Sequence, residues 1–518
     1  MSHNTSDPKV LAAMAAHYAT KPTQVWNTDM WSIVIDTDSY KVSMWKQYPP
    51  GTEYVSSYIE ARGGRFPNAV FFGLQAFLKK LERPVTAEEV AFADVYWTSQ
   101  GMPFNRAGWD YIVNELGGKL PIRIEAVEEG RVVPIKNALV QIVNTDPKCF
   151  WLTTWVETSL VRAVWYPTGV CTLSWSIKQI YRKFHEETSD ADIGIEEMFK
   201  LHDFGSRGVS SYESAELGGM AHLINFSGTD TGAAVLGAMK FYDAKIDPKV
   251  NPDTGFPTSP GYSIPAMEHS TITSWGRDHE IEAVLNMIDQ YGGPNMMLAV
   301  VGDSYDIYHF ASDIVGTKLK EMIEGLGGRF VVRPDSGDPT TVPVDIVEIL
   351  GEKFGYTTNS KGYKVLPPYI RVIQGDGINM DSIIQILTNL KAAGWSVENI
   401  VFGMGGALLQ QSNRDSMGWA MKCSAIKRAG QTKWIDVFKD PITDPDKKSK
   451  RGRLALVLSR SDDSVGYYTV PVESVSPEQN LLKPVYQDGE VLRWTSWESV
   501  KARSEEREGV LSVLPLAA

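Results

Sequence analysis

Four short apolar runs, each ending in a turn rich in glycine and aspartate, constrain the fold of this chain more than any other feature. The runs and their turns are MLAVV before GDS at 302–304, FVV before RPDSG at 333–337, YIRVI before QGDG at 374–377, and IVF before GMGG at 403–406. The turns recur at intervals of roughly thirty to forty residues, which is the length of one unit of strand plus helix. The spacing therefore predicts an α/β fold, either a parallel barrel or a doubly wound sheet.

The rest of the chain has a different pattern. With 518 residues the chain is too long for a single core, since cores stop growing at about 250–300 residues. The region before residue 151 alternates short strand and helix signals, which is typical of an α+β unit, and the region after residue 434 returns to strand signals. We expect an N-terminal arm at residues 1–30, strands at 32–36 and 54–59, and helices at 69–80 and 87–96. The stretch after residue 434, with strands such as 454–458 and 465–470, is expected to rejoin the first sheet.

The charge and the cysteines limit the partners and the location. The net charge of −12 would repel nucleic acid and anionic membranes, so neither is expected as a partner. The same charge would repel a phosphate-rich substrate, which must then be held by a local basic pocket or a metal ion. Three cysteines without C-x-x-C spacing, and no apolar leader or span, predict a cytoplasmic protein without disulfides or a zinc site.

The polar residues that follow the four runs predict a phosphate-handling site. In parallel barrels the active site lies at the carboxyl ends of the strands. Carboxylates there can hold Mg²⁺ or ribose hydroxyls, glycines expose backbone N–H groups to phosphate, and arginines donate to phosphate oxygens. The same residue types are also common in ordinary turns and helix caps, and the pattern alone does not separate the two uses. The residues are Asp303, Arg333, Asp335, Gly375, Asp376, Gly405, Gly406 and Arg414.

Three further motifs precede these units: HDFGSRGVSS at 202–211, FSGTDT at 226–231 and EHSTITSWG at 268–276. Phe204 beside Arg207 can stack on a planar ring while the guanidinium meets phosphate. A core position is an equally ordinary use of such a phenylalanine, and a single histidine such as His269 is more often structural than catalytic.

Taken together and in order, these motifs resemble the nicotinamide phosphoribosyltransferase family. TDSYK at 37–41, KQYPP at 46–50, NTDP at 144–147 and VFKDP at 437–441 also match, so the resemblance runs from about residue 36 to 453. It implies a type II phosphoribosyltransferase fold, with an irregular α/β barrel at 166–414 and a discontinuous α+β sheet domain from residues 1–165 and 415–518. It also implies a homodimer with active sites at the subunit interface.

The resemblance assigns roles to particular residues. Phe204 and the partner's Tyr40 would enclose the nicotinamide ring, and Asp230 would accept a hydrogen bond from its carboxamide. His269 would be phosphorylated by ATP, which is then a co-substrate alongside 5-phosphoribosyl-1-pyrophosphate and Mg²⁺. Arg333, Asp303, Asp335 and Asp376 would act on the ribose and pyrophosphate, with Asp335 and Asp376 nearest the metal. The remaining implied substrate contacts are Asp38, Arg62, Arg207, Arg371, Gly375, Gly405, Gly406, Arg414, Lys422 and Lys447.

Asp230 favours nicotinamide as the substrate, because the same carboxylate facing nicotinate would be a like-charge contact. The nearest rival is nicotinate phosphoribosyltransferase. An isomerase or aldolase would need a lysine or glutamate at a strand end, and a silent binding protein would have lost the charged residues. Ser206, Met404 and Ala407 depart from the family pattern, and Ala407 would be strained if its φ were positive. Residues 251–259 are expected to form an extra loop.

Overall fold

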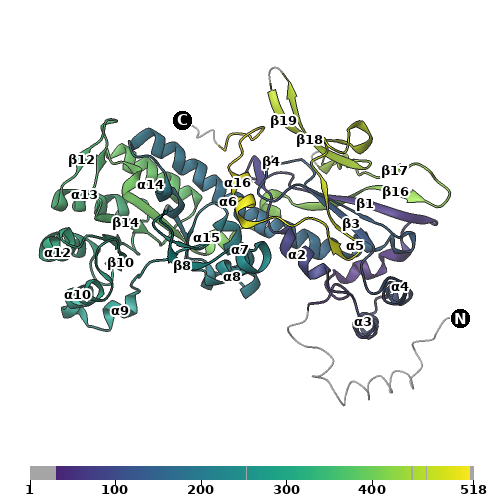
Figure 1. Cartoon of the computed structure of the whole chain (residues 1–518), viewed down its shortest axis with the longest axis horizontal. Coiled ribbons are helices and arrows are strands. Elements are labelled where there is room, and N and C mark those ends of the chain that lie inside the picture. Colours follow the sequence, from purple (N-terminus) through teal and green to yellow (C-terminus); the bar gives the residue numbers. More distant parts are fainter. Residues whose placement is uncertain (1–30, 253, 445–446, 462–463, 514–518) are drawn as a thin grey trace, which may run out of the picture.

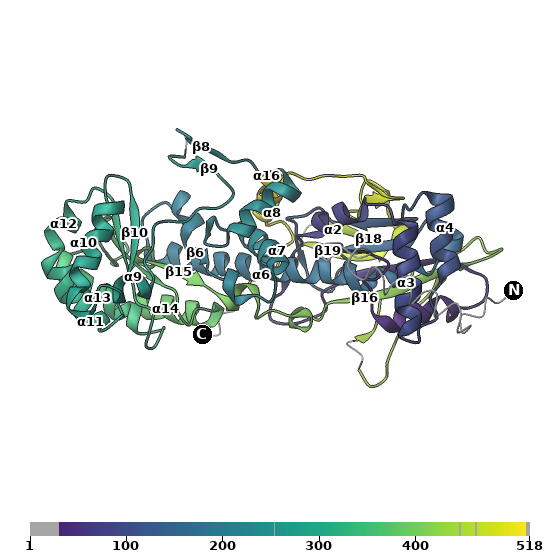
Figure 2. The same ribbon diagram turned by 90° about the horizontal axis from the view of Figure 1, so that it is seen from below.

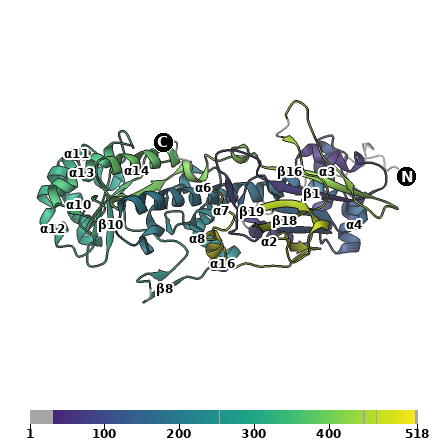
Figure 3. The same ribbon diagram turned by 90° about the horizontal axis from the view of Figure 1, so that it is seen from above.

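The computed structural model describes residues 31–252, 254–444, 447–461 and 464–513. The arm expected at residues 1–30 lies outside the described residues. Figures 1, 2 and 3 show an elongated molecule of two lobes that lie side by side, one holding β10, β14 and β15 and the other holding β1, β3 and β16. The helix α6, Glu157–Thr188, runs from one lobe into the other. The domain boundary expected at residues 165 and 166 falls inside this helix.

The first lobe is a parallel barrel. Six strands pair in the order β10-β11-β14-β15-β6-β7, and every pairing is parallel. Residues 262–267 join the two open edges: the Thr229 N–H donates to Tyr262 O, and the Met267 N–H donates to Ala299 O. The sheet therefore closes on itself, so of the two folds that the spacing of the apolar runs predicts, the barrel forms and the doubly wound sheet does not. The strands are β6 (Leu201–Asp203), β7 (Gly228–Thr229), β10 (Met297–Val301), β11 (Arg329–Arg333), β14 (Ile370–Gln374) and β15 (Ile400–Met404).

The interior of the barrel is apolar. Ala299, Val331 and Ile373 form a small buried cluster, and Phe204 and Val401 pack against it. Because side chains alternate along a strand, each strand contributes one of these residues to the interior and turns the next toward the surrounding helices. Phe204 thus lies at the carboxyl end of the barrel, over a filled core.

The second lobe is built on a seven-stranded antiparallel sheet in the order β17-β16-β1-β5-β3-β20-β21. Its strands come from both ends of the chain. They are β1 (Thr52–Glu60), β3 (Ile122–Ala126), β5 (Val140–Asn144), β16 (Ala420–Arg428), β17 (Ile435–Asp436), β20 (Lys483–Gln487) and β21 (Glu490–Val491).

The C-terminal stretch rejoins the first sheet, as expected, through β17, β20 and β21. The expected strands at 454–458 and 465–470 also form, as β18 (Leu454–Ser461) and β19 (Ser464–Pro471), but they pair with each other in a separate hairpin. Residues 32–36 are turns, not a strand. The carbonyls of Ile33 and Val34 accept hydrogen bonds from the indoles of Trp155 and Trp97, so this buried segment is held by side chains without a strand neighbour.

The helices cover both sheets. The expected helices at 69–80 and 87–96 form with shifted bounds, as α2 (Leu74–Leu81) and α3 (Ala87–Ser99). No helix in the described ranges is long and apolar enough to cross a membrane. The other helices are α4 (Arg106–Leu116), α5 (Leu152–Trp155), α7 (Tyr212–Leu223), α8 (Gly232–Tyr242), α9 (His269–Thr273), α10 (Glu280–Tyr291), α11 (Ile307–His309), α12 (Lys320–Glu324), α13 (Val342–Phe354), α14 (Met380–Ala392), α15 (Gly406–Leu409) and α16 (Trp497–Ser504).

The extra loop before His269 is a small hairpin. Its strands are β8 (Asp247–Val250) and β9 (Pro257–Thr258), and Figure 2 shows them projecting from the body of the molecule. Phe256, in the connection between the two strands, packs against Phe199 and Tyr262. The other short pairs are β2 (Asn68–Val70) with β4 (Val132–Pro134), and β12 (Thr357–Thr358) with β13 (Lys364–Val365).

Candidate active site

A histidine, an arginine and two aspartates meet at the carboxyl end of the barrel. His269 is the first residue of α9, and its Nε2 lies 2.9 Å from Asp303 Oδ1, just beyond β10. The His269 Nδ1 lies 4.0 Å from Asp335 Oδ2, and Arg333 Nη2 lies 3.5 Å from the same oxygen. The His269 side chain is 45% exposed, whereas that of Asp303 is 5% exposed. An oriented imidazole with one accessible face is suited to react with a ligand.

The carboxylates act on one another. Burial raises the pKa of Asp335, and the negative charges of Asp303 and Asp376 raise it further, against the lowering effect of Arg333 and His269. Such mutual repulsion is relieved when a cation joins the group. Among the described residues, however, no three carboxylate, histidine or cysteine groups are close enough to hold a metal ion on their own. A metal ion here would need oxygen atoms from a substrate as well.

Several buried polar atoms near these residues have no partner. Arg333 Nε, Ser304 Oγ and Gln374 Oε1 are buried and make no hydrogen bond within the described part of the chain. They lie at the carboxyl ends of β11, β10 and β14. Because leaving a buried polar atom unpaired costs about 1–3 kcal/mol, three such atoms at one edge indicate a site that a polar ligand completes.

Glycines bring the loops of this edge close to Phe204. A Cβ atom on Gly403 would lie 1.9 Å from Phe204 Cε2, and one on Gly375 would lie 3.3 Å from it. Any side chain at position 403 would collide with the Phe204 ring, so the position of this ring requires glycine there. Gly405 and Gly406 begin α15, and the Gly208 backbone packs on Gly406.

The departures at positions 404 and 407 do not strain these loops. Ala407 lies inside α15 and does not have a positive φ, so its side chain causes no backbone strain. Met404 is buried at the end of β15, and its carbonyl accepts the Phe204 N–H.

The neighbouring strand end carries Asp230. It follows β7, and its backbone N–H donates to Asp203 O on β6 at 2.9 Å. The Ser263 hydroxyl donates to Asp230 Oδ1 at 2.6 Å, which orients the carboxylate. Asp230 and Arg207 are exposed, while Phe204 is half-buried. The resemblance singled out Phe204, Arg207 and Asp230, and the structure places them on adjoining strand ends; Ser263 has no motif signal and was missed.

A basic cluster lies where the sheet lobe meets the barrel. Burial lowers the pKa of Lys422, and the positive charges of Arg62, Lys439 and Arg414 lower it further against the Glu157 carboxylate. The sequence expectation named three of these cations. It also named Lys447, whose ammonium is instead paired with Asp444 at 2.7 Å. Lys439 was missed, although it is the lysine of the VFKDP motif.

Asp38 and Tyr40 lie on the sheet lobe. Tyr40 belongs to a 3-10 helix, Ser39–Lys46, and its side chain is 60% exposed. The Asp38 carboxylate accepts a hydrogen bond from Thr158 near the start of α6, and Ser39 contacts Gln100 at the end of α3. The Lys41 ammonium lies 5.2 Å from the centre of the Tyr40 ring, and Tyr40 is otherwise largely exposed.

Arg371 requires a correction. It is the second residue of β14, near the amino end of the strand, whereas the site lies beyond Gln374 at the other end. Its guanidinium donates to the carbonyls of Leu366, Pro367 and Ile370, and burial lowers its pKa to about 10. Arg371 therefore has a structural position at the opposite end of the barrel.

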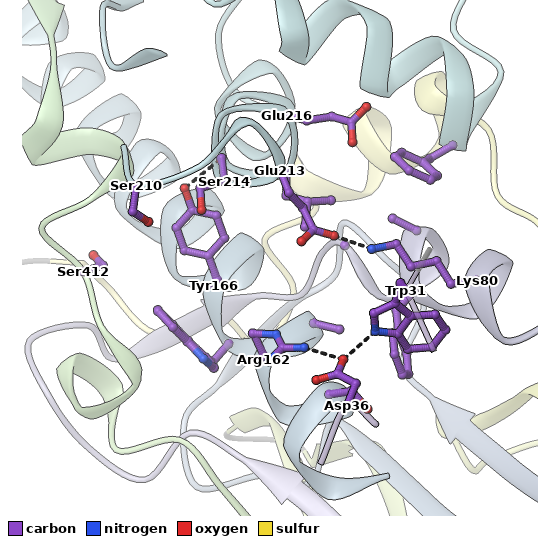
Figure 4. A pocket seen from close by; sticks show the side chains of 18 of the residues that line it. Trp31, Asp36, Lys80, Arg162, Tyr166, Ser210, Glu213, Ser214, Glu216 and Ser412 are labelled. Atoms are coloured by element: carbon purple, nitrogen blue, oxygen red, sulfur yellow. Dashed lines mark hydrogen bonds and ion pairs between the residues drawn. The ribbon is translucent and has the colours of Figure 1, made fainter. Parts of the chain in front are cut away.

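A separate cavity of about 250 Å³ lies beside the loops at 205–212 and 405–412. Figure 4 shows two ion pairs among its lining residues, Arg162 with Asp36 and Lys80 with Glu213. The Tyr166 hydroxyl donates to Ser214 O and to Leu409 O and so ties this wall to α15. None of the residues expected to bind substrate lines this cavity.

Comparison with known sequences gives a consistent set of relatives. Residues 199–490 match the model of the nicotinate phosphoribosyltransferase family, and residues 14–124 match that of the nicotinamide phosphoribosyltransferase N-terminal domain. A nicotinamide phosphoribosyltransferase of Xanthomonas campestris pv. campestris (strain 8004) is 48% identical over 479 residues, covering 92% of this chain and 98% of that protein. One of Acinetobacter baylyi is 30% identical over 507 residues, covering 90% and 95%.

Solved structures share the fold at low identity. A nicotinate-nucleotide pyrophosphorylase from Pyrococcus furiosus matches with a TM-score of 0.58 and 17% identity, covering 94% of this chain and 98% of that one. The human nicotinic acid phosphoribosyltransferase matches with a TM-score of 0.55 and 15% identity, covering 91% and 93%. At these identities the solved structures bear on the fold alone, which is that of the type II phosphoribosyltransferases.

Proposed function

The chain belongs to the nicotinamide phosphoribosyltransferase family, and from that premise we propose how its site performs the reaction. The enzyme is a pentosyltransferase of NAD salvage. It joins nicotinamide to 5-phosphoribosyl-1-pyrophosphate, and the products are nicotinamide mononucleotide and pyrophosphate. One observation carries this assignment to particular residues. Phe204 and Asp230 follow the adjoining strands β6 and β7, and the unpaired Arg333 Nε lies at the same edge of the barrel, at the end of β11.

Nicotinamide binds against Phe204. The half-buried ring is fixed by Gly403 and Gly375 behind it and offers one face to a pyridine ring. Asp230, held by Ser263, accepts a hydrogen bond from the carboxamide N–H₂. The same carboxylate opposes the carboxylate of nicotinate. This contact makes the amide the preferred base.

The phosphoribosyl group binds at the ends of β11, β14 and β15. Arg333 donates to phosphate oxygens through the Nε that has no partner in the described protein. Gly375, Gly405 and Gly406 expose backbone N–H groups to the 5′-phosphate. Arg207 is exposed in the 3-10 turn that follows Phe204, and it contacts the ribose or its phosphate.

The reaction needs no protein nucleophile. The pyridine nitrogen attacks the anomeric carbon as the bond to pyrophosphate breaks, so positive charge develops on the ribose ring. Asp335 and Asp376 stabilise that charge, and they are the residues that would hold Mg²⁺. When bound, Mg²⁺ neutralises the leaving group. The other contributions of the protein are positioning and electrostatic stabilisation.

His269 accepts the γ-phosphoryl group of ATP. Asp303 holds one ring nitrogen, which orients the imidazole and makes the other nitrogen a better nucleophile. The phosphorus–oxygen bond to ADP breaks as the nitrogen–phosphorus bond forms, and later hydrolysis of the phosphohistidine releases phosphate. We propose that this cycle supplies ATP energy to synthesis, in the cytoplasm, where the three unpaired cysteines stay reduced.

The working unit is a homodimer. Tyr40 is exposed on the sheet lobe, whereas Phe204 belongs to the barrel lobe, so we assign the Tyr40 ring to the base bound in a second subunit. Asp38 precedes it, and the basic cluster of Arg62, Arg414, Lys422 and Lys439 supplies donors for pyrophosphate or nucleotide. Each site is then made of a barrel from one subunit and a sheet lobe from the other.

An assay of the two bases in parallel tests the assignment. With Mg²⁺ and 5-phosphoribosyl-1-pyrophosphate, the purified chain is expected to convert nicotinamide and to convert nicotinate at least about 100-fold less efficiently, because of the like-charge contact at Asp230. Product would be measured by liquid chromatography. Efficient product from nicotinate alone would overturn the base assignment, and no product from either base would favour a silent scaffold.

Mixing of two inactive variants tests the shared site. Tyr40→Ala and Phe204→Ala are each expected to lose most activity, since each removes one face of the base pocket. In mixed dimers one site regains both aromatic rings, so roughly a quarter of the wild-type activity should return after subunit exchange. A mixture that stays inactive while mixed dimers are detected by mass spectrometry would show that each site is built within one chain.

A further inference from the structure

One buried carboxylate connects the two side chains that are expected to bind the base. Asp203 is the last residue of β6 and directly precedes Phe204. Its carbonyl accepts the Asp230 N–H at 2.9 Å, and β6 pairs with β7 at Asp203 and Thr229. The backbone of Asp203 therefore sets where Asp230 stands relative to Phe204.

The side chain of Asp203 reinforces both turns. Its Oδ1 accepts the Gly205 N–H at 2.7 Å, which closes the turn that has Phe204 at its corner. The Thr231 hydroxyl lies beside the same carboxyl and lowers its pKa, although neither Asp203 Oδ2 nor Thr231 Oγ1 has a partner at full hydrogen-bonding distance. One carboxyl thus touches the residue after Phe204 and the residue after Asp230.

This arrangement is costly for the fold. The Asp203 side chain is fully buried, and burial raises its pKa to about 6, with a smaller rise from the Asp230 carboxylate. Room for the carboxyl depends on glycine in α7: a Cβ on Gly219 would lie 3.3 Å from Asp203 Oδ2 and 2.6 Å from Ala234 Cβ. A buried acid beside a second acid stabilises a fold poorly, so its presence indicates a task at the site.

We propose that Asp203 is a positioning residue that holds Phe204 and Asp230 at the separation a pyridine carboxamide requires. It does not touch the substrate; it acts through the two turns. This inference rests on the base-binding roles proposed for Phe204 and Asp230. Apart from Arg207, which follows the Gly205 turn, the groups proposed to bind phosphate make no contact with the Asp203 carboxyl. Its loss should therefore affect the base more than the phosphoribosyl donor.

The test compares Asp203→Asn with a matched variant of another buried acid. Glu129 also lies buried with a pKa raised by burial, and it accepts the N–H groups of Gly73 and Gln75 at 2.9 and 2.6 Å, but it does so on the sheet lobe. In Asp203→Asn the KM for nicotinamide is expected to rise about 10-fold while the KM for 5-phosphoribosyl-1-pyrophosphate changes less than about twofold. Glu129→Gln should lower the melting temperature and leave both KM values unchanged.

Thr231→Val provides a second test that leaves the carboxyl in place. It removes the hydroxyl beside Asp203 and should raise the nicotinamide KM in the same selective way, by about threefold. Equal rises in both KM values, or no change in either variant, would overturn the positioning role. If Asp203→Asn does not fold, the two KM values of Thr231→Val test the positioning role on their own. A wild-type enzyme inactive on nicotinamide would instead overturn the proposed function.

Discussion

Replacement of His269 by alanine is expected to abolish the stimulation of nicotinamide mononucleotide synthesis by ATP. The imidazole is the group we propose as the acceptor of the γ-phosphoryl, because Asp303 fixes one nitrogen at 2.9 Å and the ring remains 45% exposed. With ATP present, kcat/KM for nicotinamide should fall on the order of 100-fold, and transfer of ³²P from γ-labelled ATP to the protein should disappear. The slower reaction without ATP should persist, since the groups that bind the base and the phosphoribosyl donor are intact.

His309 provides the control. Its Nε2 lies 3.5 Å from Asp313 Oδ2, so it is also a histidine paired with an aspartate, but both are exposed on the surface of the barrel lobe. His309→Ala should retain the label and the ATP response. Label or stimulation that survives in His269→Ala would mean that another group carries the phosphoryl.

Replacement of Asp230 by asparagine is expected to remove most of the preference for nicotinamide over nicotinate. The like-charge contact with nicotinate disappears, and that contact is worth several kcal/mol, so the ratio of the two kcat/KM values should fall by about 100-fold. Parallel steady-state assays with both bases measure this ratio. Ser263→Ala removes only the hydroxyl that orients the carboxylate, so it should reduce the ratio by less than about tenfold.

The result for Asp230 separates two sources of selectivity. If the asparagine variant keeps the wild-type ratio, the base preference arises elsewhere in the pocket, and the carboxylate has another role. If both rates fall equally, Asp230 supports the shape of the pocket without recognising the amide.

Much of the barrel could be predicted because its strands are buried on both faces. Such strands are short apolar runs, and their carboxyl ends are marked by turn residues that also carry the chemistry, as in Asp303 and Asp335. The stave that closes the barrel, residues 262–267, could not be found this way. It contains Pro265 and has no apolar run, so only its hydrogen bonds to β7 and β10 identify it.

Other parts of the site depend on contacts that no local pattern encodes. Arg371 belongs to a matching motif, but it is the second residue of β14 and therefore lies at the amino end of the barrel, opposite the site. Ser263 and Asp203 act through side-chain and backbone hydrogen bonds to residues far apart in the sequence. Residues 32–36 have the apolar character of a strand, yet two tryptophan indoles take the carbonyls that a strand neighbour would need.

The origin of the sheet-lobe strands from both chain ends has a consequence for biosynthesis. One edge of β3 pairs with β20, which follows it by about 360 residues. Ribosomes add about 5–20 residues per second, so this edge of the nascent chain stays unpaired for roughly 20–70 seconds. The barrel, made from one continuous stretch, can form on the ribosome during this interval. Unpaired β1 and β3 then present hydrogen-bonding edges to other nascent chains. A chaperone that covers these edges during synthesis should therefore improve the yield of active enzyme more than one added after release.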